Sequence, residues 1–204
     1  MSTFFGFYQD LGLALTALVI STFLLAGAVK GVIGLGLPTI AMGLLGLAMA
    51  PAQAAALLIV PSTITNVWQL ANGGYLRALL LRLWPMLLMV FVGTLLGSVW
   101  LGISSGAWAA HALGGALLLY ALVGLWLPLF RLSARQETWM GPLCGLLTGL
   151  ITAATGVFVL PAVPYLQALD LDRDERVQAL GLSFTVSTVA LAIGLAGQDV
   201  LGQA

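Results

Sequence analysis

The hydrophobic pattern of this chain consists of long apolar segments separated by short polar turns. A helix needs about 20 apolar residues to cross a hydrocarbon core of about 30 Å. Six segments come close to or reach that length: residues 11–29, 52–71, 83–101, 107–129, 139–155 and 177–196. Two further apolar segments, residues 39–50 and 157–169, are shorter and are bounded or interrupted by proline. The pattern predicts an all-α integral membrane protein, a multi-pass helical bundle that includes two short, interrupted helices.

The first short segment follows a glycine-rich stretch that is expected to break a helix. Residues 30–38 read Lys-Gly-Val-Ile-Gly-Leu-Gly-Leu-Pro. Glycine lets the backbone leave the helical conformation at little steric cost, and proline removes a backbone donor. A break exposes backbone groups that lipid cannot satisfy, so it must face protein or a wet cavity. We therefore expect these residues to line a path through the membrane: Lys30, Gly31, Gly34, Gly36 and Pro38.

The second short segment has a similar stretch before it, which predicts an internal repeat. A shift of 118 positions places Gly27 on Gly145 and Gly31 on Gly149. The same shift places the glycines and proline of the first break on Thr152, Ala154 and Gly156. We predict one transmembrane domain over residues 1–204, with repeats at about 11–129 and 139–204. Five predicted crossings separate the two breaks, so the repeats would be inverted. Paired small residues are also common in close helix packing, which is the alternative reading for Gly27 and Gly145.

Composition places the chain in lipid and excludes several partners. Hydrophobic residues make up 61% of the 204 positions and charged residues only 7%, against about 25% in a soluble domain. The formal net charge is zero, so no nucleic-acid partner is indicated. If both short segments cross, every lysine and arginine falls on one side, which would be cytoplasmic. The predicted location is the bacterial inner membrane, with the lipid bilayer as a partner and a homo-oligomer left open.

Polar residues inside two predicted spans are the remaining candidates for a binding site. Ser62, Thr65, Asn66 and Gln69 follow helical spacing and share one face, and Ser183 occupies a similar place in the second half. Substrate lining and hydrogen bonding between helices explain this face about equally well. Lys30 is either a cation that attracts an anionic substrate or an anchor that reaches toward the membrane surface.

Enzyme chemistry has no basis in this sequence. The chain has one histidine and one cysteine, and most of its acidic residues gather in a single loop. We predict no catalytic residue, no metal site and no cofactor.

Three stretches carry a family resemblance: the glycine pattern from Gly27 to Gly36, the segment from Pro61 to Gln69 and the second copy from Gly145 to Pro161. Together they resemble the TauE/SafE family of sulfite-exporter-like permeases. The resemblance implies a secondary transporter for a small anion, such as sulfite, a sulfonate or another organosulfur anion. Thr152, Thr155 and Gly156 belong to the second copy of the break and complete the candidate site, although the family commonly has glycine where this copy has the threonines. The resemblance also implies two more helices than the second repeat holds here, so we expect either a shortened member of the family or an incomplete sequence. A non-transporting membrane subunit that packs in a larger complex is the alternative.

Overall fold

All regular secondary structure in the described part of the chain is helical. The computed structural model describes residues 12–100, 107–126 and 131–197. Its helices are α2 (Leu13–Ile33), α3 (Leu37–Leu45), α4 (Pro51–Ala71), α5 (Leu76–Trp100), α6 (Ala107–Trp126), α7 (Ala134–Thr155), α8 (Ala162–Ala168) and α9 (Arg173–Gly197). This confirms the predicted all-α fold, including the two short helices α3 and α8. The predicted termini at residues 11, 101 and 127–129 lie outside the described residues.

Five of these helices are long and apolar enough to cross a membrane: α2, α4, α5, α6 and α9. Helix α7 is equally long but is not among them, and it contains four threonines, which lower its mean hydropathy. It nevertheless lies along α5 over most of its length. Near the start of α7, Glu137 pairs with Arg82 of α5. Near its end, the Cβ of Ala153 would lie 2.7 Å from a Cβ added at Gly97 of α5. Helix α7 therefore covers the same depth as a helix that is long enough to cross.

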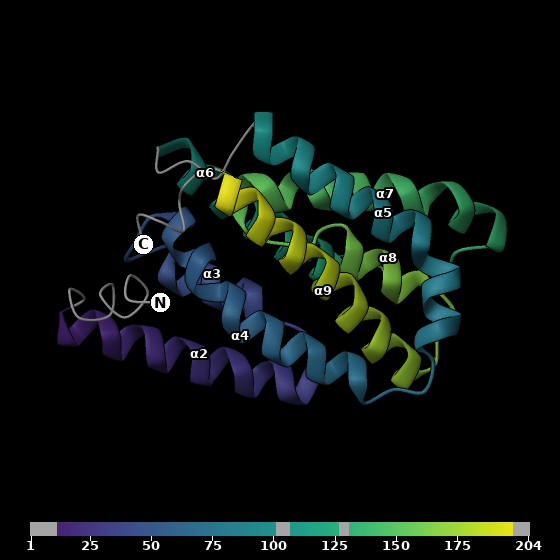
Figure 1. Ribbon diagram of the computed structural model, residues 1–204, viewed down its shortest axis with the longest axis horizontal. Coiled ribbons are helices and arrows are strands. Elements are labelled where there is room, and N and C mark those ends of the chain that lie inside the picture. The colour runs from purple at the N-terminus through teal and green to yellow at the C-terminus, as the bar shows by residue number, and fades with distance from the viewer. Residues whose placement is uncertain (1–11, 101–106, 127–130, 198–204) are drawn as a thin grey trace.

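The direction of each helix follows from a few contacts. The Gln69 side chain near the end of α4 donates to Gly34 O, just after α2, and to Val177 O, in the first turns of α9. Helices α2 and α4 therefore end where α9 begins, and α4 and α9 are antiparallel (Figure 1). Helices α5 and α7 are parallel and start at this same end, because α5 begins shortly after α4 stops. The segments that hold α3 and α8 must therefore connect opposite ends of the bundle, as the crossing topology predicts.

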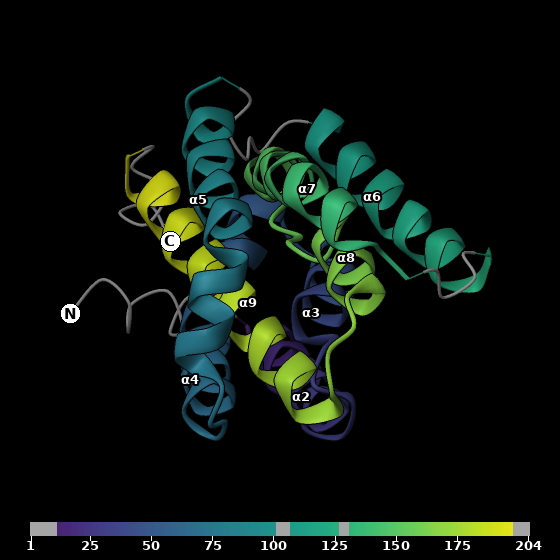
Figure 2. The ribbon, with the colours of Figure 1, turned by 90° about the vertical axis from the view of Figure 1, so that its right-hand side faces the viewer.

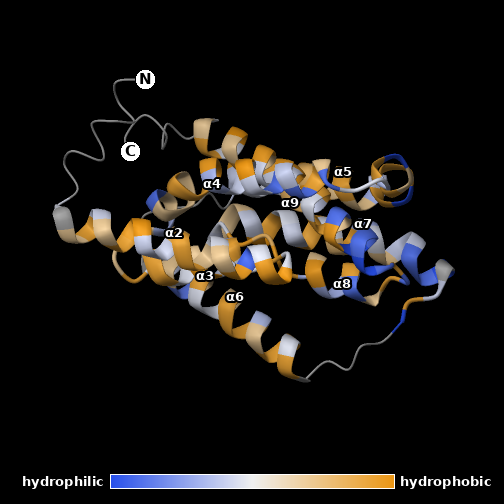
Figure 3. Cartoon of the chain, turned by 90° about the horizontal axis from the view of Figure 1, so that it is seen from below, coloured by the Kyte–Doolittle hydropathy of each residue, from blue (hydrophilic) through white to orange (hydrophobic). Residues whose placement is uncertain are grey.

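All seven basic residues lie at this one end. Lys30 is near the end of α2, and the six arginines lie at or just before the starts of α5, α7 and α9. Hydrophobic residues cover most of the helices, while hydrophilic residues concentrate where α7 begins (Figure 3). Because basic residues accumulate on the cytoplasmic side of membrane proteins, we expect this end to face the cytoplasm.

The tightest packing joins α5 to α7 through glycine. A Cβ added at Gly145 would lie 2.2 Å from Met86 O, and one at Gly149 would lie 2.5 Å from both Val90 O and Thr94 N. Backbone contacts this close are typical of small residues at helix interfaces in membranes. Helix α9 packs against both α5 and α4, and α6 lies on the outside of the bundle (Figure 2). Gly145 thus has the packing role that the sequence left open.

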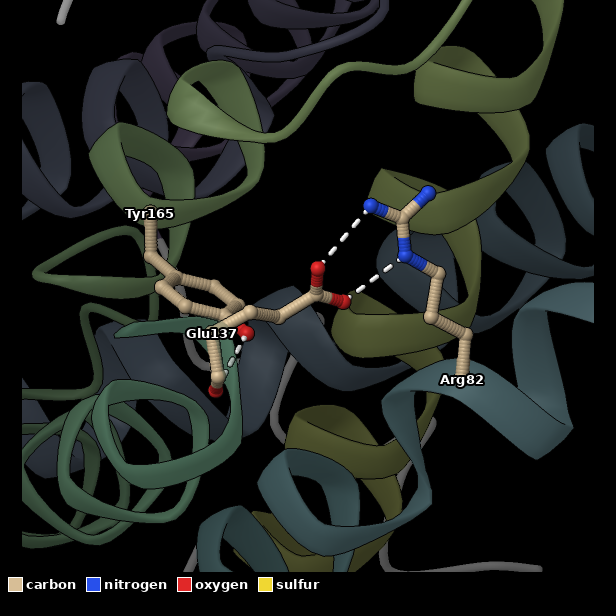
Figure 4. Close-up of polar contacts among 3 residues, drawn as sticks. All are labelled: Arg82, Glu137 and Tyr165. Carbon is tan, nitrogen blue, oxygen red and sulfur yellow. Dashed lines mark hydrogen bonds and ion pairs between the residues drawn. The ribbon is translucent and has the colours of Figure 1, made fainter. Parts of the chain in front are cut away.

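A bidentate ion pair joins α5 and α7 at the basic end of the bundle (Figure 4). Arg82 Nε and a second guanidinium nitrogen of Arg82 donate to the two carboxylate oxygens of Glu137, at 2.7 and 2.9 Å. The Tyr165 hydroxyl donates to the backbone carbonyl of Glu137 at 3.4 Å. Two parallel bonds fix the orientation of both side chains, so the pair holds α5 against α7 and brings α8 to the same point.

The two helix breaks share one geometry, but their register differs from the predicted one. Gly34 and Gly156 both adopt the left-handed conformation, with φ of 81° and 72°. Each donates its N–H back into the preceding helix, Gly34 to Lys30 O and Gly156 to Thr152 O. The equivalent glycines are therefore 122 positions apart, and the predicted shift of 118 is wrong. Lys30 and Gly31 still belong to α2, because the chain first leaves the right-handed helix at Gly34, which adopts the left-handed conformation that L side chains disfavour.

Candidate functional site

A cavity of about 1130 Å³ opens where α2, α4 and α9 meet at the basic end of the bundle. The last two turns of α2 form one wall, the second half of α4 another, and the first turns of α9 the third. Five residues predicted from the sequence line this cavity: Lys30, Gly31, Gly34, Thr65 and Gln69. The cavity contains the first break of the chain, from Gly34 to Leu35.

Lys30 is the central side chain of this site. It is only 5% exposed, although α2 as a whole is the outermost wall. Its ammonium group donates to Thr65 Oγ1 at 3.0 Å and to Asn66 Oδ1, so it bridges α2 to α4. The ring of Phe184 on α9 lies 5.6 Å from Nζ, within the range of a cation–π contact. The side chain therefore contacts both other walls, and a surface anchor would not be buried in this way.

No carboxylate neutralises Lys30 within the described residues. The two ion pairs there join Arg82 to Glu137 and Arg131 to Asp170. Asparagine and threonine oxygens satisfy hydrogen bonds but carry no net charge. A buried charge with neutral partners alone is costly, by several kcal/mol. The site is therefore suited to a mobile anion, which would supply the missing charge.

Further buried polar atoms on α4 and α9 have no hydrogen-bond partner. They are the hydroxyls of Ser62, Ser183 and Ser187, the Oε1 atom of Gln69 and the Nε atom of Arg176. Asn66 links the same two helices by donating to Thr188 Oγ1 at 3.2 Å. Serine hydroxyls can donate to an anion, whereas Gln69 Oε1 can only accept. The cavity lining does not include Ser62, Asn66, Ser183 or Ser187, so the uncommitted donor at its wall, besides the Lys30 ammonium group, is Arg176 Nε.

Two glutamines hold this part of the bundle together. Gln69 Nε2 donates to Gly34 O at 2.9 Å and to Val177 O at 2.8 Å. Gln178 on α9 donates to Leu70 O at 2.7 Å and to Gly73 O at 2.9 Å, at the end of α4. The first glutamine therefore fixes the break to both neighbouring helices, and the second fixes α9 to the turn after α4.

Replacing Gln69 by leucine should destabilise the protein. The substitution removes the donor for two backbone carbonyls in a partly buried site, which we expect to lower the free energy of unfolding by about 2 kcal/mol. Thermal unfolding of the detergent-solubilised protein measures the change. Asn72→Ala is the matched control, because the Asn72 amide is exposed and bonds only within its own helix, to Trp68 O. Equal unfolding temperatures for the two variants would show that the break does not depend on Gln69.

The mouth of the cavity carries charges from the first turn of α9. Arg173, Asp174 and Arg176 all line it. Arg176 is partly committed, because it donates to Leu171 O at 2.9 Å. Arg173 is exposed, so it can meet an ion that approaches from the aqueous side.

The other predicted site residues lie outside this cavity. Gly36 and Pro38 are buried at the start of α3, where Gly36 has φ of 108° and Pro38 is a first-turn residue. Thr152 and Thr155 donate to Thr148 O and Ile151 O in their own helix, both at 2.7 Å. Threonine often bonds back to its helix in this way.

The two breaks also lie apart. The space a Cβ would occupy at Gly34 is bordered by Gln69 and Val177, and the space at Gly156 by Met42 and Ala55. The structure therefore does not bring the second break to the cavity.

Sequence reasoning missed Phe184 and Gln178. Phe184 was one apolar residue among many in its span, and nothing in the sequence pairs it with Lys30. Gln178 is a polar residue at the second position of a predicted span, which was a usable signal. It is 1% exposed, and a Cβ at Gly73 would lie only 2.3 Å from its side chain.

Fold and site together define a multi-pass α-helical membrane protein with two oppositely directed helix breaks and a buried cation facing a cavity. The profile of the sulfite exporter TauE/SafE family matches residues 19–203. The chain therefore belongs to the TauE/SafE family of membrane transporters. No curated protein and no solved structure matches it.

Proposed function

We propose that this chain carries a small anion across the bacterial inner membrane, with the anion bound beside Lys30. The observation that carries the proposal is the burial of Lys30 against neutral partners at the wall of an open cavity. Sulfite is the first candidate because the family is described as sulfite exporters. Sulfonates are the second, since they present the same kind of charged sulfur–oxygen group.

The chemistry of the site fits an oxyanion. The ammonium group would pair with one oxygen of the anion, and Arg176, which lines the same cavity and has an unpartnered Nε, is a donor for another. Hydrogen bonds between charged groups are about twice as strong as neutral ones. Asn66 and Thr65 would then position the ammonium group rather than neutralise it.

Alternating access is the transport mechanism that the architecture favours. Helices α4 and α9 are antiparallel and follow breaks of opposite direction, an arrangement typical of inverted-repeat carriers. In such carriers one repeat moves against the other around a central site. The cavity opens at the basic end, so we assign this conformation to a state that is open to the cytoplasm.

Flux through reconstituted protein tests the proposal. The full chain is placed in liposomes preloaded with unlabelled sulfite, and the uptake of external ³⁵S-sulfite is followed against protein-free liposomes. We expect accelerated uptake that unlabelled sulfite or methanesulfonate competes away and chloride does not. If no anion exchanges, and the protein instead purifies as a stable complex with another membrane protein, the non-transporting subunit is the better description.

Arg173→Gln should weaken substrate capture without abolishing transport. An exposed charge at a cavity mouth contributes about 0.2–1 kcal/mol, so we expect KM to rise by a factor of about 1.4 to 5 with little change in maximal rate. The difference should shrink as salt is raised, because salt screens exposed charges. Arg131→Gln is the matched control, since Arg131 is exposed at the same end, pairs with Asp170 and does not line the cavity. Equal KM values for both variants would exclude a role for Arg173 in capture.

A further inference from the structure

The hydrogen bonds of Lys30 suit an amine that gives up its proton. The structure provides two acceptors, Thr65 Oγ1 and Asn66 Oδ1. An ammonium group has three protons to donate and no lone pair, whereas a neutral amine has two protons. The two acceptors therefore satisfy the neutral form completely and leave the charged form one acceptor short. An anion in the cavity would be that third acceptor.

Charged groups around Lys30 do not compensate its charge. Helices α2 and α3 carry no other charged residue, and α4 carries none at all. On α9, three charged residues of the first turn line the same cavity as Lys30: Arg173, Asp174 and Arg176. None of them forms an ion pair with Lys30. Glu175 lies in the same turn but does not line the cavity, and the turn as a whole balances two positive residues with two negative ones, so it supplies no net charge that would neutralise Lys30.

A buried lysine can lose its charge by releasing a proton, whereas a buried arginine cannot. Lysine gives up its proton readily when buried, while the guanidinium group stays charged. A carrier must also return without substrate, and a lone cation inside the membrane would oppose that step. A neutral Lys30 removes the opposition.

We propose that Lys30 takes up one proton with each anion that it binds, so that this carrier moves the anion and a proton together. The proposal rests on the anion transport proposed above and specifies its coupling. On one side the Nζ lone pair takes a proton from water, and the resulting ammonium group pairs with the anion. On the other side the anion leaves and the proton returns to water. For a monovalent anion, no net charge crosses.

Methanesulfonate is the probe that separates this coupling from simple protonation of the substrate. A sulfonate stays ionised throughout the working pH range, so any proton that accompanies it is held by the protein. Liposomes with the full chain and a trapped pH dye receive external methanesulfonate, with the membrane potential clamped by potassium and valinomycin. We expect one proton inside for each anion, uptake that does not respond to potential, and about tenfold accumulation per pH unit of gradient.

Lys30→Arg gives a second and independent signature. Its guanidinium group can still pair with an anion but cannot release a proton. We expect exchange of internal for external methanesulfonate to persist, while net uptake falls at least about tenfold because the unloaded carrier would return as a cation. Size-exclusion chromatography checks that the variant is folded, and the proton-to-anion ratio of the wild type stands without it.

The outcomes separate this proposal from the transport function itself. Proton coupling is overturned, and anion transport stands, if methanesulfonate enters without acidifying the interior and its accumulation changes about tenfold for every ~59 mV of membrane potential. Equal net uptake and exchange in Lys30→Arg and the wild type overturns it as well. No movement of either methanesulfonate or sulfite overturns both proposals.

Discussion

Replacing Lys30 by glutamine is expected to lower anion uptake at sub-saturating substrate by at least about 30-fold. Removing one partner of a buried charged pair costs roughly 2–5 kcal/mol, and 1.4 kcal/mol is a factor of ten. Glutamine keeps a donor for Thr65 and Asn66 but supplies no charge for the anion. Initial rates of ³⁵S-sulfite uptake, corrected for the amount of reconstituted protein, measure the loss.

Arg77→Gln is the matched control for this variant. Arg77 lies at the same end of the bundle, in the first turn of α5, and it is exposed and does not line the cavity. Its replacement removes the same charge from the chain, so we expect uptake close to that of the wild type. A loss of equal size in both variants would mean that overall charge, rather than the cation at the cavity wall, determines the rate.

The second large effect concerns the glycine packing between α5 and α7. Gly149→Ala should lower the free energy of unfolding by about 3 kcal/mol, at the upper end of the usual cost of overpacking. The new Cβ would lie 2.5–2.7 Å from three backbone atoms of α5, and backbone cannot move aside as a flexible side chain can. Thermal unfolding of the solubilised protein, followed by circular dichroism, reports the change.

Gly27→Ala provides the comparison, because Gly27 is 122 positions before Gly149 and equivalent to it by the register of the two breaks. Nothing lies within 4 Å of a Cβ at Gly27. Alanine is also the better helix former, by about 1 kcal/mol. We therefore expect this variant to be as stable as the wild type or slightly more so. Equal destabilisation of the two variants would contradict the described packing of α7 on α5.

The helices and the short segments could be predicted from sequence because each depends on a property local in the chain. Apolar length predicted α2, α4, α5, α6 and α9, and the proline-bounded runs predicted α3 and α8. The polar spacing from Ser62 to Gln69 also predicted a face that turns inward, and three of its members, Ser62, Asn66 and Gln69, are buried.

The exact positions of the helix breaks could not be predicted from the sequence and became clear only from the structure. Among 25 glycines, Gly31 and Gly34 look alike in sequence, yet only Gly34 takes the left-handed conformation. Matching Gly31 to Gly149 therefore aligned two helical glycines and shifted the repeat by four positions. Register depends on which backbone leaves the helix, and composition does not encode that directly.

The hydrogen-bond partners of Lys30 likewise could not be predicted from the sequence. Thr65 and Asn66 were candidates as members of a polar face, but their distance of 35 and 36 positions from Lys30 carries no signal of contact. Burial of Lys30 results from how α2 packs near α4 and α9. The choice between a buried cation and a surface anchor is thus decided by tertiary packing.

The most direct test of an anion site at Lys30 uses the fact that Lys30 is the only lysine in the chain. Cyanate is a small reagent that carbamylates amines, and mass spectrometry of the peptide that contains Lys30 gives the rate of modification. We predict that saturating sulfite or methanesulfonate slows this rate at least fivefold, while gluconate at the same ionic strength does not. The α-amino group of the same chain should react equally in all three. Carbamylation of Lys30 at one rate with and without sulfite or methanesulfonate would contradict the assignment of this cavity as the anion site.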